Sequence, residues 1–210
     1  MIFNFTNKYN FATRLEVNNE NIEVVEKTKL LGVIVTSDLK WEENTDSLVK
    51  RAYGRMQLLR KVASFTSNKE DLLQIYKLFV RPILEQSCNV WSSSLTQESS
   101  DALERVQKAA YKVILGTNYK TYEEAQEILQ TTNLKQRRNK LCLNFAKKCV
   151  KNPKFQNLFP LNKQKSVMKL RKQDKFKIDH INTERLKKSA IPHMKRILNE
   201  HYNNEKKHKN

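Results

Sequence analysis

The first part of the chain alternates apolar and polar residues. Phe3 and Phe5, and further on Leu15 and Val17, have polar neighbours. A period of two predicts short, half-buried strands. The run Asn-Asn-Glu-Asn at 18–21 then predicts a hairpin turn, because asparagine tolerates a positive φ.

Gly32, one of three glycines in the 210 residues, lies in the apolar run 30–35, where a third strand is expected. A glycine inside a strand indicates a bulge or a position where another backbone comes close. A plain packing accommodation is the other interpretation, and the pattern alone does not separate the two.

From Asn44 onward the apolar period becomes helical. The first predicted helix has an apolar stripe at spacings of three and four residues, formed by Leu48, Ala52, Met56, Leu59 and Ala63. A capping box at 67–70 predicts a second helix, which is apolar on most sides and is expected to be central and buried until Pro82 kinks or ends it. A third helix is expected from about Thr96 to a glycine cap at Gly116.

The rest of the chain is expected to be helical and basic. Thr121 caps a short helix, and a longer one is expected over 134–150. Residues 160–180 are expected to be weakly structured, and a last helix over 183–202 is expected to be interrupted at Pro192. The predicted fold class is therefore α+β and mainly α, with three parts: strands over 1–42, a helical bundle over 43–116 and a basic helical region over 117–210.

Five basic residues lie on the first predicted helix: Lys50, Arg51, Arg55, Arg60 and Lys61. Four of them have no acidic residue three or four positions away, and Lys50 has Asp46 alone. A solvated face is the ordinary interpretation of such charges. A face without partner carboxylates is nevertheless available to an external anion.

The net charge of +18 is unevenly placed. Residues 1–130 carry 17 basic and 17 acidic residues, whereas residues 131–210 carry 23 basic and 5 acidic ones. This charge favours a polyanionic partner, nucleic acid before an anionic membrane surface. No apolar run is long enough to predict a membrane span, and the first residues do not resemble a signal peptide.

Residues that could support catalysis or bind a metal are sparse. The sequence has no glycine-rich phosphate loop, nucleophile elbow or His-Glu-x-x-His motif. Its three cysteines, Cys88, Cys142 and Cys149, are not closely spaced, which argues against a disulfide framework and favours a location inside the cell, in cytoplasm or nucleus. Core cysteines are a better interpretation than zinc ligands, because no C-x-x-C pair is present. We expect no cofactor to bind this chain.

Four segments follow one another along the chain: LLGVIVTSDLKW, LLRKVASF, DLLQIYKLFVRPILEQSCNVWSSSL and DALERVQKAAYKVILG. In this order and spacing they resemble the reverse transcriptases of non-LTR retrotransposons, above all the jockey-like elements of arthropods. The later segments LFPLN and NTERLKKSAIPHMKRILN are similar to the C-terminal end of those proteins. The resemblance covers nearly the whole chain, although no single motif in it is decisive.

The resemblance implies a fragment of an RNA-directed DNA polymerase. Residues 1–42 would be the end of the palm and the primer-grip hairpin, 43–116 the thumb, and 117–210 a basic C-terminal region. The catalytic palm, which holds two Mg²⁺ ions at an Ala-Asp-Asp turn, would precede Met1. We therefore expect no catalytic residue or metal ligand here, and no polymerase activity from this chain alone.

The resemblance also implies a role for the basic residues. Gly32 would let the backbone approach the primer's terminal phosphates, with Leu31 and Val33 anchoring the hairpin. The thumb would hold an RNA–DNA template–primer duplex through phosphate contacts, which position it without reading its sequence. The expected nucleic-acid-binding residues are Leu31, Gly32, Lys50, Arg51, Arg55, Arg60, Lys61, Arg137, Arg138 and Lys140.

A second hypothesis is a catalytically inactive remnant that acts as a helical protein-interaction module. In that case the positive charge would be incidental. Binding to a duplex through several phosphates weakens steeply with salt, so salt dependence separates the two hypotheses.

Overall fold

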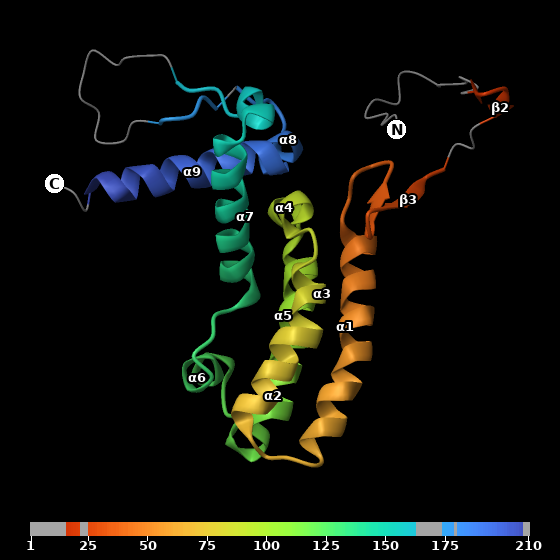
Figure 1. The fold of residues 1–210 in the computed structure, drawn as a ribbon, viewed down its shortest axis with the longest axis vertical. Helices are drawn as coiled ribbons and strands as arrows, with labels where there is room; N and C mark the ends of the chain where they lie inside the picture. Colours follow the sequence, from red (N-terminus) through yellow and green to blue (C-terminus); the bar gives the residue numbers. More distant parts are fainter. Residues whose placement is uncertain (1–15, 22–24, 163–173, 179, 208–210) are drawn as a thin grey trace.

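The computed structural model describes residues 16–21, 25–162, 174–178 and 180–207 (Figure 1). The predicted fold class, α+β and mainly α, is confirmed: small antiparallel hairpins precede a series of helices. The strands are β1 (Glu16–Val17), β2 (Glu20–Asn21), β3 (Lys27–Leu30) and β4 (Val33–Thr36). The helices are α1 (Glu42–Ala63), α2 (Lys69–Ile75), the π-helical η1 (Tyr76–Val80), α3 (Arg81–Glu85), α4 (Cys88–Trp91), α5 (Gln97–Leu115), α6 (Tyr122–Ile128), α7 (Leu134–Lys151), α8 (Glu184–Lys188) and α9 (Ala190–Lys207). Short 3-10 segments are η2 (Ser92–Ser94), η3 (Gly116–Asn118) and η4 (Pro153–Leu158).

Most of the helices form a bundle, and α9 lies across one end of it. In Figure 1, α1, α2 with α3, and α5 run side by side, α7 lies on the other side of α4 and α5 from α1, and α9 crosses the upper end of α7. The main core lies inside the bundle, where Met56, Tyr76, Trp91 and Leu103 are fully buried. A second apolar cluster lies where α9 meets α7 and centres on the buried Phe176.

Helix α1 forms because its apolar residues return to one face at helical spacing. The predicted stripe is confirmed: Leu48, Ala52, Met56 and Leu59 are buried, and Ala63 is partly buried. The helix begins at Glu42, slightly earlier than Asn44, because the Trp41 carbonyl already accepts the Thr45 backbone N–H and hydroxyl. Its apolar face packs on α5, η1 and α3.

The first hairpin is tighter than expected. Asn18 and Asn19 form the turn with φ of 51° and 64°, so Glu20 and Asn21 already pair with β1. A two-residue turn with both φ values positive matches the right-handed twist of the flanking strands. The strand positions expected at Phe3, Phe5 and Leu15 lie outside the described residues.

The expected strand over 30–35 is wrong, because Leu31 and Gly32 form a two-residue turn within it. Their φ values are 48° and 84°, and Leu30 pairs with Val33 across the turn. Leu31 is 90% exposed and does not anchor the hairpin, whereas Val33 is buried. The hairpin is held on α1 by Val33 and Val35 in the core and by the Ile34 N–H, which donates to Asn44 Oδ1 at 3.1 Å.

Gly32→Ala is expected to lower the free energy of unfolding by about 1–2 kcal/mol, because an L-residue is strained at this positive φ. A Cβ here would also lie 2.4 Å from Gln86 Nε2, so the Gln86 side chain must shift. Urea unfolding followed by circular dichroism measures the change. Leu31→Gly is the control and should stay within about 0.5 kcal/mol of wild type. Equal stability of the wild-type and Gly32→Ala proteins would contradict this account.

The second predicted helix is neither continuous nor buried on most sides. Asn68 caps α2 in place of Ser67, accepting the Glu70 N–H at 3.0 Å. The chain then widens into η1, where the Arg81 N–H bonds to the carbonyl five residues back at Tyr76, and Pro82 falls in the first turn of α3, where its missing N–H costs little. On η1, Leu78 and Phe79 are 66% and 47% exposed.

Three expected helix ends are confirmed. Thr96 caps α5 by accepting the Ser99 N–H at 3.2 Å, and Gly116 ends this helix with a φ of 52°. Thr121 caps α6 through the Glu124 N–H. The basic helix expected over 134–150 is α7, which ends one residue later at Lys151.

The last helix is interrupted at Ser189 and not at Pro192. Ser189 adopts an extended ψ of 163° between α8 and α9, while Pro192 lies in the first turn of α9, where no intrahelical N–H is needed. The segment 160–180, which was expected to be weakly structured, is described at 160–162, 174–178 and 180, and residues there make specific contacts. Phe176 is fully buried, and its backbone N–H and carbonyl bond to Asn199 Oδ1 at 2.8 Å and Nδ2 at 3.0 Å.

Candidate nucleic-acid interface

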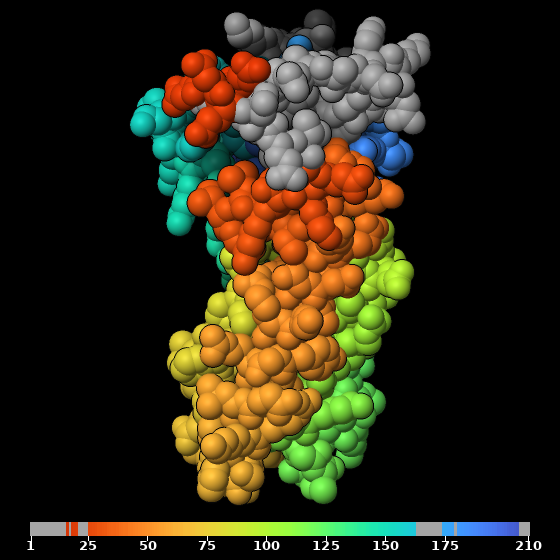
Figure 2. Space-filling model, turned by 90° about the vertical axis from the view of Figure 1, so that its right-hand side faces the viewer, coloured from red at the N-terminus to blue at the C-terminus, as the bar shows by residue number. Residues whose placement is uncertain are grey.

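All five predicted basic residues of α1 are exposed. No ion pair involves any of them among the residues that the structure describes. Arg51 donates from Nη2 to Gln86 Oε1 at 2.9 Å, an uncharged partner that leaves its charge unneutralised. Figure 2 shows α1 in orange along the front of one side of the bundle, with the yellow α2–α3 segment on one flank and the green α5 on the other.

The five cations are spread around the exposed side of α1, from the two shoulders of the buried stripe to the face opposite it. At 100° per residue, Lys50 and Lys61 lie opposite the buried stripe, and Arg51 and Arg55 lie on one shoulder. The hydrogen bond of Arg51 to Gln86 places that shoulder beside α3. Arg60 lies on the other shoulder. This arrangement presents a broad cationic strip and so suits a polyanion with phosphates along its whole contact length.

Helix α1 carries a glycine, Gly54, between these cations. A Cβ added there would have no neighbour within 4 Å, and Gly54 is exposed in the middle of the helix. Glycine in a helix interior costs about 1 kcal/mol relative to alanine.

Gly54→Ala is therefore expected to raise the free energy of unfolding by about 0.5–1 kcal/mol. Thermal unfolding measured by differential scanning calorimetry reports the gain. Gly116→Ala serves as the opposite control, because its φ of 52° penalises alanine. Our description of Gly54 would be wrong if alanine there lowered the melting temperature.

Arg137 lies on α7 but is not available to a phosphate. It is bound by Glu85 in a two-pronged ion pair, with Nε on Oε1 and Nη2 donating to Oε2 at 3.1 Å. The hydrogen bonds that Arg137 donates to Glu85 raise the pKa of the Arg137 guanidinium. The prediction that Arg137 binds nucleic acid is thus corrected: its side chain fastens α7 to the end of α3.

Arg138 needs the same correction, because it is 2% exposed. Its Nη2 donates to Ser100 Oγ at 3.3 Å, while Nη1 has no hydrogen-bond partner within the described structure. Burial lowers the pKa of the Arg138 guanidinium. A side chain enclosed in this way between α7 and α5 does not reach a duplex outside.

Lys140, the third predicted residue of α7, is exposed. It belongs to a row that the sequence pattern alone did not reveal, composed of Gln136, Lys140, Asn144, Lys147 and Lys151 in that order along the helix. These five residues, here named the lysine stripe, lie opposite the buried face of α7, which contains Leu134, Arg138, Cys142, Ala146 and Cys149. The spacing of four, seven and eleven residues in a helix without acidic residues was the available signal.

The start of α7 is fixed by a partly buried carboxylate. Glu104 on α5 accepts the Leu134 N–H at 3.2 Å and the Lys135 N–H at 2.8 Å. It also accepts the Tyr122 hydroxyl at 2.6 Å. Burial and then this bond to Glu104 raise the pKa of Tyr122, so the phenol stays neutral as a donor. The orientation of the lysine stripe is therefore set by α5.

Leu31 and Gly32 lie at the tip of the second hairpin, beside the start of α1. The close neighbour of Gly32 is Gln86 of the same chain. The positive φ of Gly32 and this contact explain the glycine within the molecule. A contact of either residue with a primer stays a prediction.

The cysteines are buried, as expected of core residues. Cys142 Sγ lies 3.9 Å from the Cys88 carbonyl oxygen and 3.5 Å from Ser92 Oγ. Hydrogen bonding with the Cys88 thiol, and then with the Ser92 hydroxyl, lowers the pKa of the Cys142 thiol. Within the described residues, no group of three histidine, cysteine or acidic side chains is placed to hold a metal ion, and no helix has the length and apolarity needed to cross a membrane.

Comparison with known protein families, curated proteins and solved structures gives no match. The resemblance to reverse transcriptases therefore stays a prediction from sequence segments. The structural features that point to a function are two exposed cationic surfaces, one on α1 and one on α7.

Proposed function

We propose that this chain is the primer-grip, thumb and C-terminal part of a jockey-like non-LTR reverse transcriptase, and that α1 holds a template–primer duplex by sequence-independent phosphate contacts. The observation that carries this proposal is the set of exposed cations on α1. Lys50, Arg55, Arg60 and Lys61 have neither a salt bridge nor a hydrogen bond from their side chains to another described residue.

Other exposed cations of the chain do form ion pairs, so the lack of partners on α1 is a specific feature of that helix. Lys27 bonds to Glu43 at 2.8 Å and Lys187 to Glu184 at 3.0 Å, although both pairs are exposed. The acidic residues of α1 are Glu42, Glu43 and Asp46, all near its start. The remaining length of the helix therefore keeps an unneutralised positive potential, which attracts a polyanion.

The chemistry of this surface suits phosphate recognition without sequence reading. Arginine and lysine bind phosphate oxygens, and such contacts fix the position of a duplex. The catalytic step and its Mg²⁺ ions belong to the palm, which this chain is not proposed to contain. The proposed role of the chain is to hold the duplex.

Fluorescence anisotropy with a labelled RNA–DNA duplex tests the proposal. Engagement of about five phosphates, one for each cation of α1, should weaken the affinity by about 500-fold between 50 and 200 mM salt. Duplexes of scrambled sequence should bind within about threefold of one another, because phosphate contacts carry no base readout. Absent binding at 50 mM salt, or binding that is flat with salt, would refute the proposal.

A salt-independent result would favour the alternative, a helical protein-interaction module. The observation behind that alternative is the exposure of Leu78 and Phe79 on η1. Association through these apolar side chains would persist at high salt, because the hydrophobic effect does not depend on charge.

A further inference from the structure

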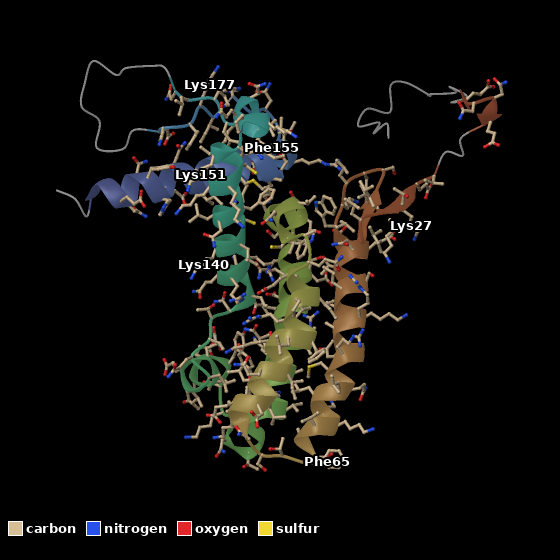
Figure 3. All side chains as sticks on the ribbon, viewed as in Figure 1. Lys27, Phe65, Lys140, Lys151, Phe155 and Lys177 are labelled. Carbon is tan, nitrogen blue, oxygen red and sulfur yellow. The ribbon has the colours of Figure 1, made fainter. Side chains whose placement is uncertain are left out.

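The cationic surfaces of α1 and α7 point in opposite directions. Helix α5 lies between the two helices and contacts both. The buried face of α1 packs towards α5, and so does the buried face of α7 through Leu134 and Arg138. On α1, Lys50 and Lys61 lie opposite the buried face, and on α7 the lysine stripe does so, so these lysines of the two helices point outwards from the bundle on opposite sides. Figure 3 shows Lys140 and Lys151 on α7, on the other side of the bundle from α1.

The distance between these surfaces is too large for a shared ligand. Packed helices have axes about 8–10 Å apart, so two packing steps separate the axes of α1 and α7 by about 16–20 Å. The side chains then extend outwards on both sides. A straight duplex that lies on α1 therefore does not reach the lysine stripe.

The composition of the lysine stripe indicates its partner. Lys140 to Lys151 extends over about 16 Å of helix, and helix α7 has no acidic residue to neutralise it. One amide side chain, Asn144, lies between the lysines and another, Gln136, lies one turn before Lys140, and none of the three lysines has an ion pair among the described residues. A membrane-binding helix inserts a broad apolar face, whereas the face of α7 opposite the lysine stripe is already buried against α4, α5 and α9. Lysines with amides between them suit phosphate and sugar oxygens.

We propose that the lysine stripe binds a second nucleic-acid segment, so that one chain bridges two nucleic acids. This inference rests on the proposed function for the α1 surface and adds a second, independent surface. Lys140, Lys147 and Lys151 contact phosphates of the second segment, while α1 holds the first. In a retrotransposon protein the second segment would be another nucleic acid brought beside the template–primer duplex.

A bridging assay tests this directly. One duplex is attached to beads, a second duplex carries a fluorophore, and the fluorescence retained on the beads is measured at 50 mM salt with the full chain. Three variants of equal net charge are compared. They are the α7 variant K140Q/K147Q/K151Q, the α1 variant K50Q/R55Q/K61Q and the control R105Q/K120Q/K188Q, whose three residues are exposed outside both surfaces and outside the proposed primer-grip hairpin.

Retained fluorescence should fall at least tenfold in the α7 variant and in the α1 variant, and should stay within about twofold of wild type in the control. The α7 variant and the α1 variant should both still bind a single duplex in solution, since each keeps one of the two cationic surfaces. Far-UV circular dichroism should be unchanged in all three, because every replaced side chain is exposed or, at Lys147, partly exposed.

Two results would overturn the inference. If the α7 variant bridges as well as wild type, the second duplex is held elsewhere or by a second copy of the chain. If the α7 variant keeps bridging but loses binding to vesicles of anionic lipid, the lysine stripe binds membranes. Failure of the proposed function gives a different pattern: the α1 variant bridges normally, or no protein binds any duplex.

Discussion

Gln107→Leu is expected to lower the free energy of unfolding by about 3–5 kcal/mol, because it removes the hub of a buried hydrogen-bond network. Gln107 is fully buried on α5. Its Oε1 accepts the Tyr76 hydroxyl at 2.6 Å, and its Nε2 donates to the Tyr122 hydroxyl at 2.8 Å and to the Thr132 carbonyl at 3.0 Å. Leucine fills a similar volume but satisfies none of these groups.

The cost arises from the partners that are left behind. The Tyr76 side chain is fully buried, and burial raises the pKa of Tyr76 well above its ordinary value, so the hydroxyl cannot escape by ionising. The Thr132 carbonyl also loses its donor, but Thr132 is exposed and its carbonyl adds less to the cost. Each unsatisfied buried group costs about 1–3 kcal/mol, and Tyr122 retains Glu104 as a partner.

Chemical denaturation with guanidinium chloride measures this effect. Tyr76→Phe is the matched control: it removes one hydroxyl, leaves Gln107 Oε1 unpaired and should cost about 1–2 kcal/mol. A double variant, Tyr76→Phe with Gln107→Leu, should cost less than the sum of the two, because both ends of one bond are removed. Strict additivity, or a loss below about 1 kcal/mol in Gln107→Leu, would contradict a hub role.

The second large effect is expected in duplex affinity. In a chain whose lysine stripe is already neutralised by K140Q/K147Q/K151Q, adding K50Q/R55Q/K61Q should weaken binding at 100 mM salt on the order of 10²-fold. The plot of log affinity against log salt should become less steep by about 2.7, because each lost phosphate contact removes about 0.9 from the slope. The K140Q/K147Q/K151Q protein is used as the starting point because the α1 surface is then the one remaining cationic surface of the two.

Adding R105Q/K120Q/K188Q to the same background is the matched control. It changes the net charge equally, so a general loss of positive charge would affect both proteins alike. Equal salt slopes for the two proteins would show that α1 makes no close phosphate contacts, and the proposed function would then fail. Anisotropy titrations at four salt concentrations between 50 and 200 mM give the slopes.

Local features of this fold could be predicted from the sequence. The buried stripe of α1, the caps at Thr96 and Thr121 and the glycine end at Gly116 are all found where the sequence analysis placed them. Each depends on residues within about four positions along the chain, since helix periodicity and capping are short-range interactions. The mainly helical class followed from the same signals.

Other features depended on which distant segment covers a residue. Lys140 and Arg138 are both basic residues of α7, yet Lys140 is exposed and Arg138 is buried against α5. Sequence spacing placed both on one helix but could not say which face α5 would cover. The same holds for Arg137, whose partner Glu85 lies 52 positions away.

The sequence by itself determined the helices, their caps and the excess of positive charge in the last 80 residues. The tertiary structure decided which cations face outwards, that Gly32 lies in a turn against Gln86, and that the surfaces of α1 and α7 point apart. The physical reason is range: a helix is specified by neighbours along the chain, whereas burial, ion pairing and the direction of a face are set by packing between segments far apart in sequence.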